Sequence, residues 1–211
     1  MSEIKAIIFD MDGVLIDAKD WHYEALNRAL QLFGIEISRY DHLVTFDGLP
    51  TKKKLEMLSL ERGLPVALHE FINEMKQQYT MEIVYAKCKP RFLHEFALAN
   101  LRREGYRLAV ASNSVRKTVQ VMMEQAGLLP YLEFFLSNQD VQKGKPDPEV
   151  YNKAIGRLGL KPFECLIVED NEKGIRAAKA SGAKVMEVAD IGDVNYMNIK
   201  AHIDTASEAR I

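Results

Sequence analysis

The chain has 211 residues, of which 47% are hydrophobic and 27% charged, and its formal net charge is −2. This balance is typical of a globular protein with one sizeable domain or a domain plus a small insertion, and it excludes a disordered chain. The near-neutral charge argues against nucleic acid as the main partner. No apolar run approaches the ~20 residues of a membrane span, so we expect no membrane partner. Only two cysteines, Cys88 and Cys165, and no recognisable secretory signal favour a cytoplasmic protein.

Strand and helix patterns alternate over most of the chain. Four apolar runs are typical of buried strands, with a weaker fifth at Phe134–Ser137: Ile4–Phe9, Arg107–Ala111, Cys165–Val168 and Ala183–Val188. Helical patterns lie between them at Thr118–Ala126, Glu149–Leu158 and Lys173–Ser181. This alternation predicts an α/β fold with right-handed βαβ units and a mostly parallel sheet. Such a sheet has its ligand crevice beyond the carboxyl ends of the strands.

Residues 17–85 break this alternation. They contain helix-period patterns and no convincing strand, with the clearest helices at Trp21–Phe33, Thr51–Glu61 and His69–Tyr79. We therefore expect an all-helical cap domain at 17–85, inserted into an α/β core formed by 1–16 and 86–211. The weakly patterned end of the chain contains His202–Asp204, a candidate edge strand.

Two acids follow the first predicted strand. Asp10 and Asp12 are one residue apart, so they leave the strand end on the same side, and Gly13 then lets the chain turn. Two carboxylates at this point indicate a metal ion, a covalent nucleophile, or both. The alternative is a pair of turn-forming aspartates after an edge strand.

Two further segments supply groups that can bind an anion. Ser112, Asn113 and Ser114 follow a strand where the next helix begins, so a hydroxyl and exposed amides can cradle a phosphate. The alternative is a plain helix cap supplied by Ser114. Lys145 lies between Gly144 and Pro146, a rigid turn that can present it as a fixed cation, whereas most lysines are merely solvated.

The fourth apolar strand runs directly into Glu169 and Asp170. Acids at the end of a buried strand are costly unless they are paired or bind a metal. A carboxylate that attacks a phosphate monoester is an anion approaching a dianion, so a cation and Mg²⁺ would be needed beside it. Mg²⁺ prefers one or two carboxylates, which Asp10 and Asp170 can supply.

With these motifs the chain resembles the haloacid dehalogenase superfamily of aspartate-nucleophile phosphotransferases. Within it the chain is most similar to the β-phosphoglucomutase-like phosphatases, which carry a helical cap after the first strand of a Rossmann-like core. The resemblance covers essentially the whole chain. All four family motifs occur in order: Asp10-Met-Asp12-Gly-Val, Ala-Ser112-Asn-Ser, Gly-Lys145-Pro-Asp-Pro-Glu and Glu169-Asp170.

The resemblance implies a catalytic role for each motif. Asp10 would be the nucleophile that forms an aspartyl-phosphate, and Asp12 would protonate the leaving oxygen and later activate water. Ser112 and the amide of Asn113 would hold the transferring phosphoryl group. Lys145 would bridge that group and Asp10.

The resemblance also implies a metal site. Mg²⁺ would bind Asp10, the backbone carbonyl of Asp12, and Asp170, with Glu169 either a ligand or a partner of one.

Substrate choice is expected to lie with the cap. His22 stands where many relatives place a histidine that faces the nucleophile, although in isolation it would be a surface residue of a helix. Thr51 and Lys52 lie in the family's specificity segment, where a solvated helix face is the alternative for the run Lys52–Lys54. The β-phosphoglucomutases have an arginine where Thr51 falls, which argues against a mutase.

The leading hypothesis is a Mg²⁺-dependent phosphatase that acts on a small phosphorylated metabolite, such as a sugar phosphate, as a monomer or weak dimer. The first alternative is a β-phosphoglucomutase-like phosphomutase, which shares Asp10 and Asp12. The second is a phospho-accepting switch, in which Asp12 and the cap would be superfluous.

Overall fold

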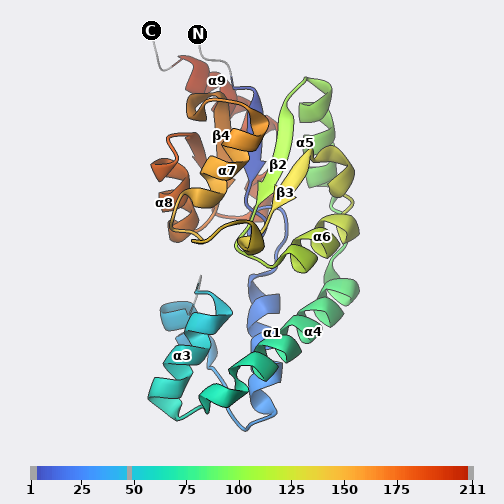
Figure 1. Ribbon diagram of the computed structural model, residues 1–211. Helices are drawn as coiled ribbons and strands as arrows, with labels where there is room; N and C mark the ends of the chain where they lie inside the picture. The colour runs from blue at the N-terminus through green and yellow to red at the C-terminus, as the bar shows by residue number, and fades with distance from the viewer. Residues whose placement is uncertain (1–3, 47–48, 209–211) are drawn as a thin grey trace. The chain divides into compact units, whose positions relative to one another are not determined.

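The computed structural model describes residues 4–46 and 49–208 (Figure 1). The chain forms two compact units. One, here called the core unit, consists of Met1–Asp17 and Cys88–Ile211, and the other, the cap unit, is Ala18–Lys87. The boundaries predicted from the sequence, 17 and 85, lie close to these.

The core unit is built on a five-stranded sheet with the strand order β3-β2-β1-β4-β5, and every paired strand is parallel to its neighbour. The predicted parallel sheet is therefore confirmed, and its first strand is central. The strands are β1 (Ala6–Phe9), β2 (Arg107–Ala111), β3 (Phe134–Leu136), β4 (Cys165–Glu169) and β5 (Lys184–Glu187). The central strands are buried on both faces, which explains their continuous apolar sequences.

The register of the sheet aligns the strand ends. Phe9 pairs with Val110 on one side and with Val168 on the other. The next residue, Asp10, donates its backbone N–H to the carbonyl of Val168 at 3.0 Å. Asp10 and Glu169 thus leave the sheet at one level, which is the edge where a parallel sheet binds ligands.

Helices complete the core unit: α5 (Phe92–Arg103), α6 (Arg116–Gln125), α7 (Glu149–Leu158), α8 (Glu172–Ala180) and α9 (Tyr196–Glu208). Short 3-10 turns lie between them at Leu129–Tyr131, Asn138–Asp140, Pro162–Glu164 and Ile191–Asp193. Residues of α7 and α8 share one apolar cluster with one face of the sheet, including Ile8, Ala109, Tyr151 and Ile167. Figure 1 shows α7 lying across the sheet.

The predicted edge strand at His202–Asp204 is wrong, because these residues belong to α9. Ile199 and Ile203 are both buried and are four residues apart, the spacing of one helix face. The Asn195 side chain accepts a hydrogen bond from the N–H of Asn198 at 2.9 Å, which satisfies an amide at the start of the helix.

All regular secondary structure in the described residues of the cap unit is helical. It contains α1 (Lys19–Gln31), α2 (Arg39–Asp41), a π-helical turn (His42–Phe46), α3 (Thr51–Arg62), a 3-10 turn (Val66–Leu68) and α4 (His69–Lys87). The predicted helical insertion is therefore confirmed. Helix α4 extends well beyond the predicted Tyr79, because the buried Ile83 and Val84 continue its apolar face.

A small apolar core holds the cap unit together, with Leu30, Phe46 and Leu58 among its members. The Asn27 side chain fixes the segment after α1 from both sides. It accepts from the N–H of Ile37 at 2.9 Å and donates to the Ile37 carbonyl at 2.8 Å. Within residues 4–46 and 49–208, no helix has the length and apolar character needed to cross a bilayer.

Candidate active site

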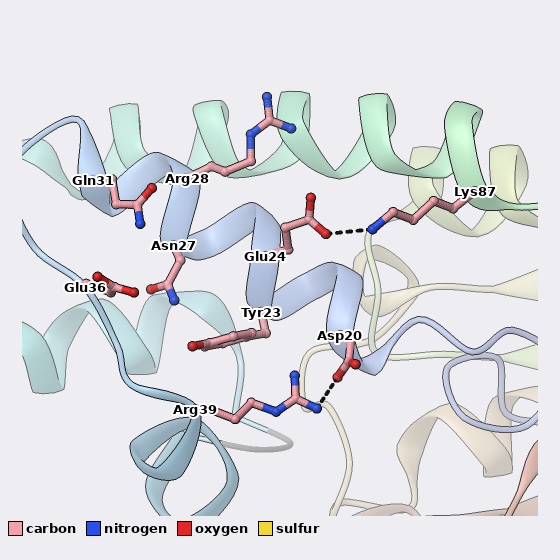
Figure 2. A pocket seen from close by; sticks show the side chains of 9 residues that line it. All are labelled: Asp20, Tyr23, Glu24, Asn27, Arg28, Gln31, Glu36, Arg39 and Lys87. Atoms are coloured by element: carbon pink, nitrogen blue, oxygen red, sulfur yellow. Dashed lines mark hydrogen bonds and ion pairs between the residues drawn. The ribbon is translucent and has the colours of Figure 1, made fainter.

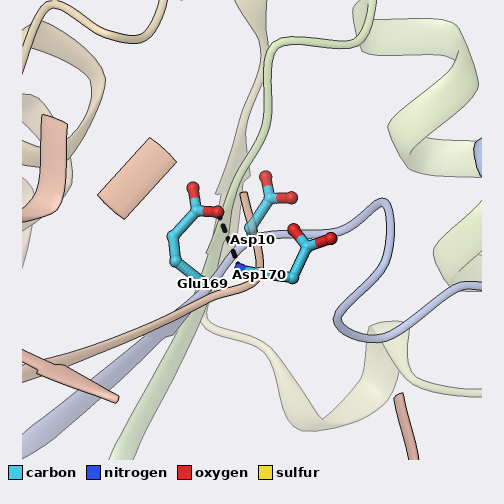
Figure 3. A group of neighbouring side chains, drawn as sticks. All are labelled: Asp10, Glu169 and Asp170. Atoms are coloured by element: carbon cyan, nitrogen blue, oxygen red, sulfur yellow. Dashed lines mark hydrogen bonds between the residues drawn. The ribbon is translucent and has the colours of Figure 1, made fainter. Parts of the chain in front are cut away.

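Three carboxylates converge at the ends of β1 and β4. Asp10, Glu169 and Asp170 each offer an oxygen, and these oxygens lie within 4.8 Å of one another. Figure 3 shows the three side chains grouped around the strand ends. Asp10 is only 5% exposed and Glu169 is fully buried, so this is not a solvated acidic surface. Buried like charges repel strongly, which calls for a cation at this point.

Lys145 supplies one cation directly. Its ammonium donates to Asp10 Oδ1 at 2.6 Å, to Glu169 Oε1 at 2.7 Å and to the Ala111 carbonyl at 2.9 Å. Three acceptors match the three protons of an ammonium, so the side chain is held in one place. The backbone of Lys145 is fixed by Asn113, whose Oδ1 accepts from its N–H at 3.0 Å. The sequence did not predict this clamping role for the Asn113 side chain.

Burial affects the ionisation of both Asp10 and Lys145. Burial raises the pKa of Asp10 well above its ordinary value, and the charges of Glu169 and Asp12 add to this effect, while Lys145 opposes it. Burial would lower the pKa of Lys145, but Asp10 and Glu169 outweigh it and hold that pKa above its ordinary value. Lys145 therefore stays an ammonium, and one ammonium does not neutralise the several acids around it.

The residues present fit a magnesium ion. The candidate ligands are all carboxylate oxygens, the hard donors that Mg²⁺ prefers, and no thiol or imidazole belongs to the group. Asp10 and Asp170 offer the two carboxylates that such a site uses.

Glu169 is held at both of its oxygens. Its Oε1 accepts from Lys145 and from the hydroxyl of Tyr151. Its Oε2 accepts from the N–H of Asp170 at 3.1 Å and from Asn171 Nδ2 at 3.3 Å. The carboxylate lies directly over Gly174, where an added Cβ would stand 1.9 Å from Oε1. The position of Glu169 thus requires glycine at 174.

We expect Gly174→Ala to destabilise the protein by about 1–3 kcal/mol, because the new methyl group overlaps a buried carboxylate that cannot easily move. Thermal unfolding measures the effect. Gly156→Ala is the matched control, since it also adds a methyl group inside a helix but meets no atom within 4 Å. It should stabilise by about 0.5–1 kcal/mol. Equal shifts in the two variants would contradict the assigned packing.

Asp12 is tied to the segment that follows β2. Its Oδ2 accepts from the Ser114 hydroxyl at 2.8 Å, and the N–H of Ser114 donates to the buried Ser112 hydroxyl at 3.0 Å. The sequence suggested Ser114 as part of an anion cradle or, alternatively, as a helix cap, but the cap position of α6 belongs to Val115. Asn113 and Ser114 lie in a bend, so the spacing of the serines alone did not predict the contact of Ser114 with Asp12.

The predicted substrate residues of the cap unit lie on two helices. His22 is half-buried on α1, with its Nδ1 3.5 Å from the ammonium of Lys76 on α4. Thr51 is the first residue of α3 and Lys52 is exposed on it, whereas Lys54 is buried. The sequence could not determine which of the consecutive lysines is buried.

The cap unit also contains a hollow of about 460 Å³ along α1, shown in Figure 2. None of the predicted site residues lines it. Four of its charged residues form two ion pairs: Arg39 with Asp20 at 2.7 Å, and Lys87 with Glu24 at 2.8 Å. The lining as a whole has as many acidic as basic residues, so it offers little net charge to attract a phosphate.

Comparison with known proteins agrees with this geometry. The family model described as haloacid dehalogenase-like hydrolase matches residues 7–188, and the chain belongs to this family. The chain is 28% identical over 182 residues to a phosphorylated carbohydrates phosphatase of Thermotoga maritima, covering 85% of this chain and 82% of that one. It is 30% identical over 195 residues to the pyrophosphatase PpaX of Bacillus velezensis, covering 88% and 83%. Its fold matches the crystal structure of a β-phosphoglucomutase from Clostridium difficile with a TM-score of 0.81, at 19% identity and coverage of 96% and 98%.

Proposed function

We propose that the protein is a Mg²⁺-dependent phosphatase that hydrolyses a small phosphorylated metabolite, such as a sugar phosphate, through an aspartyl-phosphate on Asp10. The observation that carries the proposal is the contact of the buried Asp10 with the Lys145 ammonium at 2.6 Å, beside Glu169 and Asp170. Relatives named as phosphatases support it. The net charge of −2 supports a small substrate rather than nucleic acid. We propose that the chain acts in the cytoplasm as a monomer or weak dimer.

In the first step, the Asp10 carboxylate attacks phosphorus, and the bond from phosphorus to the leaving alcohol breaks. Asp12 donates a proton to the departing oxygen. The Ser112 hydroxyl and the backbone amide of Asn113 bind the phosphoryl oxygens. Lys145 offsets negative charge on both Asp10 and the phosphoryl group, so that the two anions can approach.

In the second step, Asp12 removes a proton from water, the water oxygen attacks phosphorus, and the bond from phosphorus to Asp10 breaks. Inorganic phosphate leaves, and the Asp10 carboxylate is restored. The Ser114 hydroxyl holds Asp12 at 2.8 Å and thereby orients it. Magnesium bound by Asp10, Asp170 and the Asp12 carbonyl, with Glu169 beside them, would add positive charge against the phosphoryl dianion. His22, Thr51 and Lys52 of the cap unit are proposed to bind the rest of the substrate.

Phosphate release tests the proposal. Purified protein with Mg²⁺ should release inorganic phosphate from at least one member of a panel of phosphorylated sugars and other small metabolites. Chelation should lower the rate by more than about 100-fold, because the dianion loses its main electrostatic partner, and added Mg²⁺ should restore it. Absence of phosphate release across a broad panel would refute the phosphatase.

A phosphomutase is the second candidate, because the fold is shared with a β-phosphoglucomutase. Product analysis by ³¹P NMR separates the two activities. A mutase would yield an isomerised phosphosugar without inorganic phosphate, whereas the proposed phosphatase yields inorganic phosphate.

A further inference from the structure

We propose that Tyr151 is a positioning residue of the active site: its hydroxyl holds Glu169 against Lys145, so that Glu169 anchors the lysine and makes no direct bond to magnesium. This inference rests on the proposed function, because it assigns which acids of that site bind magnesium and which one holds Lys145.

The first argument is the saturation of the Glu169 carboxylate. A carboxylate has about four lone-pair directions. Here the protein itself supplies four donors. The Lys145 ammonium and the Tyr151 hydroxyl donate to Oε1, and the N–H of Asp170 and the Asn171 amide donate to Oε2. A direct bond from Glu169 to a metal would have to displace one of these donors inside a fully buried environment.

The second argument is the placement of Tyr151 itself. It lies on α7, is fully buried, and contacts both members of the Lys145–Glu169 pair. Its hydroxyl donates to Glu169 Oε1, and the Lys145 ammonium lies 4.7 Å from the centre of its ring.

The consequence is a separation of tasks. With Glu169 committed to Lys145, the carboxylates left to bind magnesium are Asp10 and Asp170, the number that Mg²⁺ commonly takes from proteins. Lys145 in turn keeps Glu169 as its third acceptor, after Asp10 and the Ala111 carbonyl, and stays beside Asp10. Without the Tyr151 hydroxyl, one lone pair of Glu169 would be released toward the metal, and the lysine would lose part of its anchor.

The test is Tyr151→Phe, which removes the hydroxyl and preserves the ring. Calorimetric titration of substrate-free protein should show Mg²⁺ binding about three- to tenfold tighter than in the wild type, because a charge-assisted hydrogen bond no longer competes for Glu169. The kcat for the best substrate should fall about tenfold, because Lys145 is less firmly held. A merely structural role would lower thermal stability without tightening metal binding.

Tyr131→Phe is the matched control. It also removes a phenol-to-carboxylate contact in the core unit, between Tyr131 and Glu95 at 3.4 Å, and it should leave both Mg²⁺ affinity and kcat unchanged. Unchanged or weaker Mg²⁺ binding in Tyr151→Phe would overturn the proposal. These titrations need no substrate, so they decide the role of Tyr151 even if no phosphatase activity is found.

A measurement on the wild type covers the case in which the variant does not fold. A crystal structure grown with Mg²⁺ should show both Glu169 oxygens beyond bonding distance of the ion, with Tyr151 still donating to Oε1. A Glu169 oxygen at about 2.1 Å from the ion would be a direct ligand and would overturn the proposal.

Discussion

Asp10→Asn is expected to abolish turnover while raising the melting temperature of the metal-free protein. The amide is a poor nucleophile, so the rate should fall by more than about 10⁴-fold. Stability should rise because the variant removes a buried charge that lies among Glu169, Asp12 and other acids. Each kcal/mol gained corresponds to about 2–4 °C in Tm for a chain of this size.

The pH dependence of this stabilisation has a definite sign. Because burial raises the native pKa of Asp10, the folded state binds the proton more tightly than the unfolded state does. The wild type therefore loses stability as pH rises from the unfolded value, about 3.9, through the raised native value. The Tm advantage of Asp10→Asn should grow over the same range in chelator and shrink when Mg²⁺ is added.

Thermal scans of both proteins at several pH values, with chelator and with Mg²⁺, provide the measurement. Asp204→Asn, at an exposed position of α9, is the control and should change neither activity nor Tm appreciably. Substantial activity in Asp10→Asn would rule out the aspartyl-phosphate mechanism.

Asp12→Asn is expected to slow turnover by about 10²–10⁴-fold, because the site loses its general acid and base. The loss should be larger for the hydrolysis of the intermediate, where water must be deprotonated. Phosphate should therefore accumulate on Asp10, and intact-mass spectrometry after rapid acid quench should detect the phosphorylated protein.

The double variant Asp10→Asn with Asp12→Asn is the control and should form no phosphoprotein. A long-lived phosphoprotein in the wild type would instead favour a phospho-accepting switch. If Asp12→Asn retains wild-type turnover, the acid–base role belongs to another group.

The sequence predicted the strands well, and it placed Asp10 and Asp170 at the carboxyl ends of two of them. Apolar runs such as Cys165–Val168 differ clearly in period from the amphipathic helices around them. In a parallel sheet the carboxyl ends share one edge, so Asp10 and Asp170 could be expected to meet without knowledge of the strand order.

The hydrogen-bond network around Glu169 could not be predicted in the same way. Tyr151 occupies an apolar position of α7, so the helical period alone assigns it to the hydrophobic core. Its hydroxyl acquires a role only because α7 crosses the sheet near the end of β4, a tertiary fact that local patterns do not encode. The clamp of Asn113 on Lys145 likewise joins segments that are far apart in the chain.

The C-terminal helix was missed for a different reason. Three residues, His202–Asp204, alternate between polar and apolar, which fits a strand as well as one turn of a helix. Ile199 and Ile203 together would have indicated the helical period over a longer window.

The strand order also bears on how the protein is made. Among the strands of this sheet, β1 is synthesised first and is the central one, and its two neighbours begin only at Arg107 and Cys165. Nascent chains shorter than this expose an unpaired apolar edge, the kind of surface that recruits other chains. Synthesis of this protein therefore includes an extended interval in which protection by a chaperone should improve the yield of native molecules.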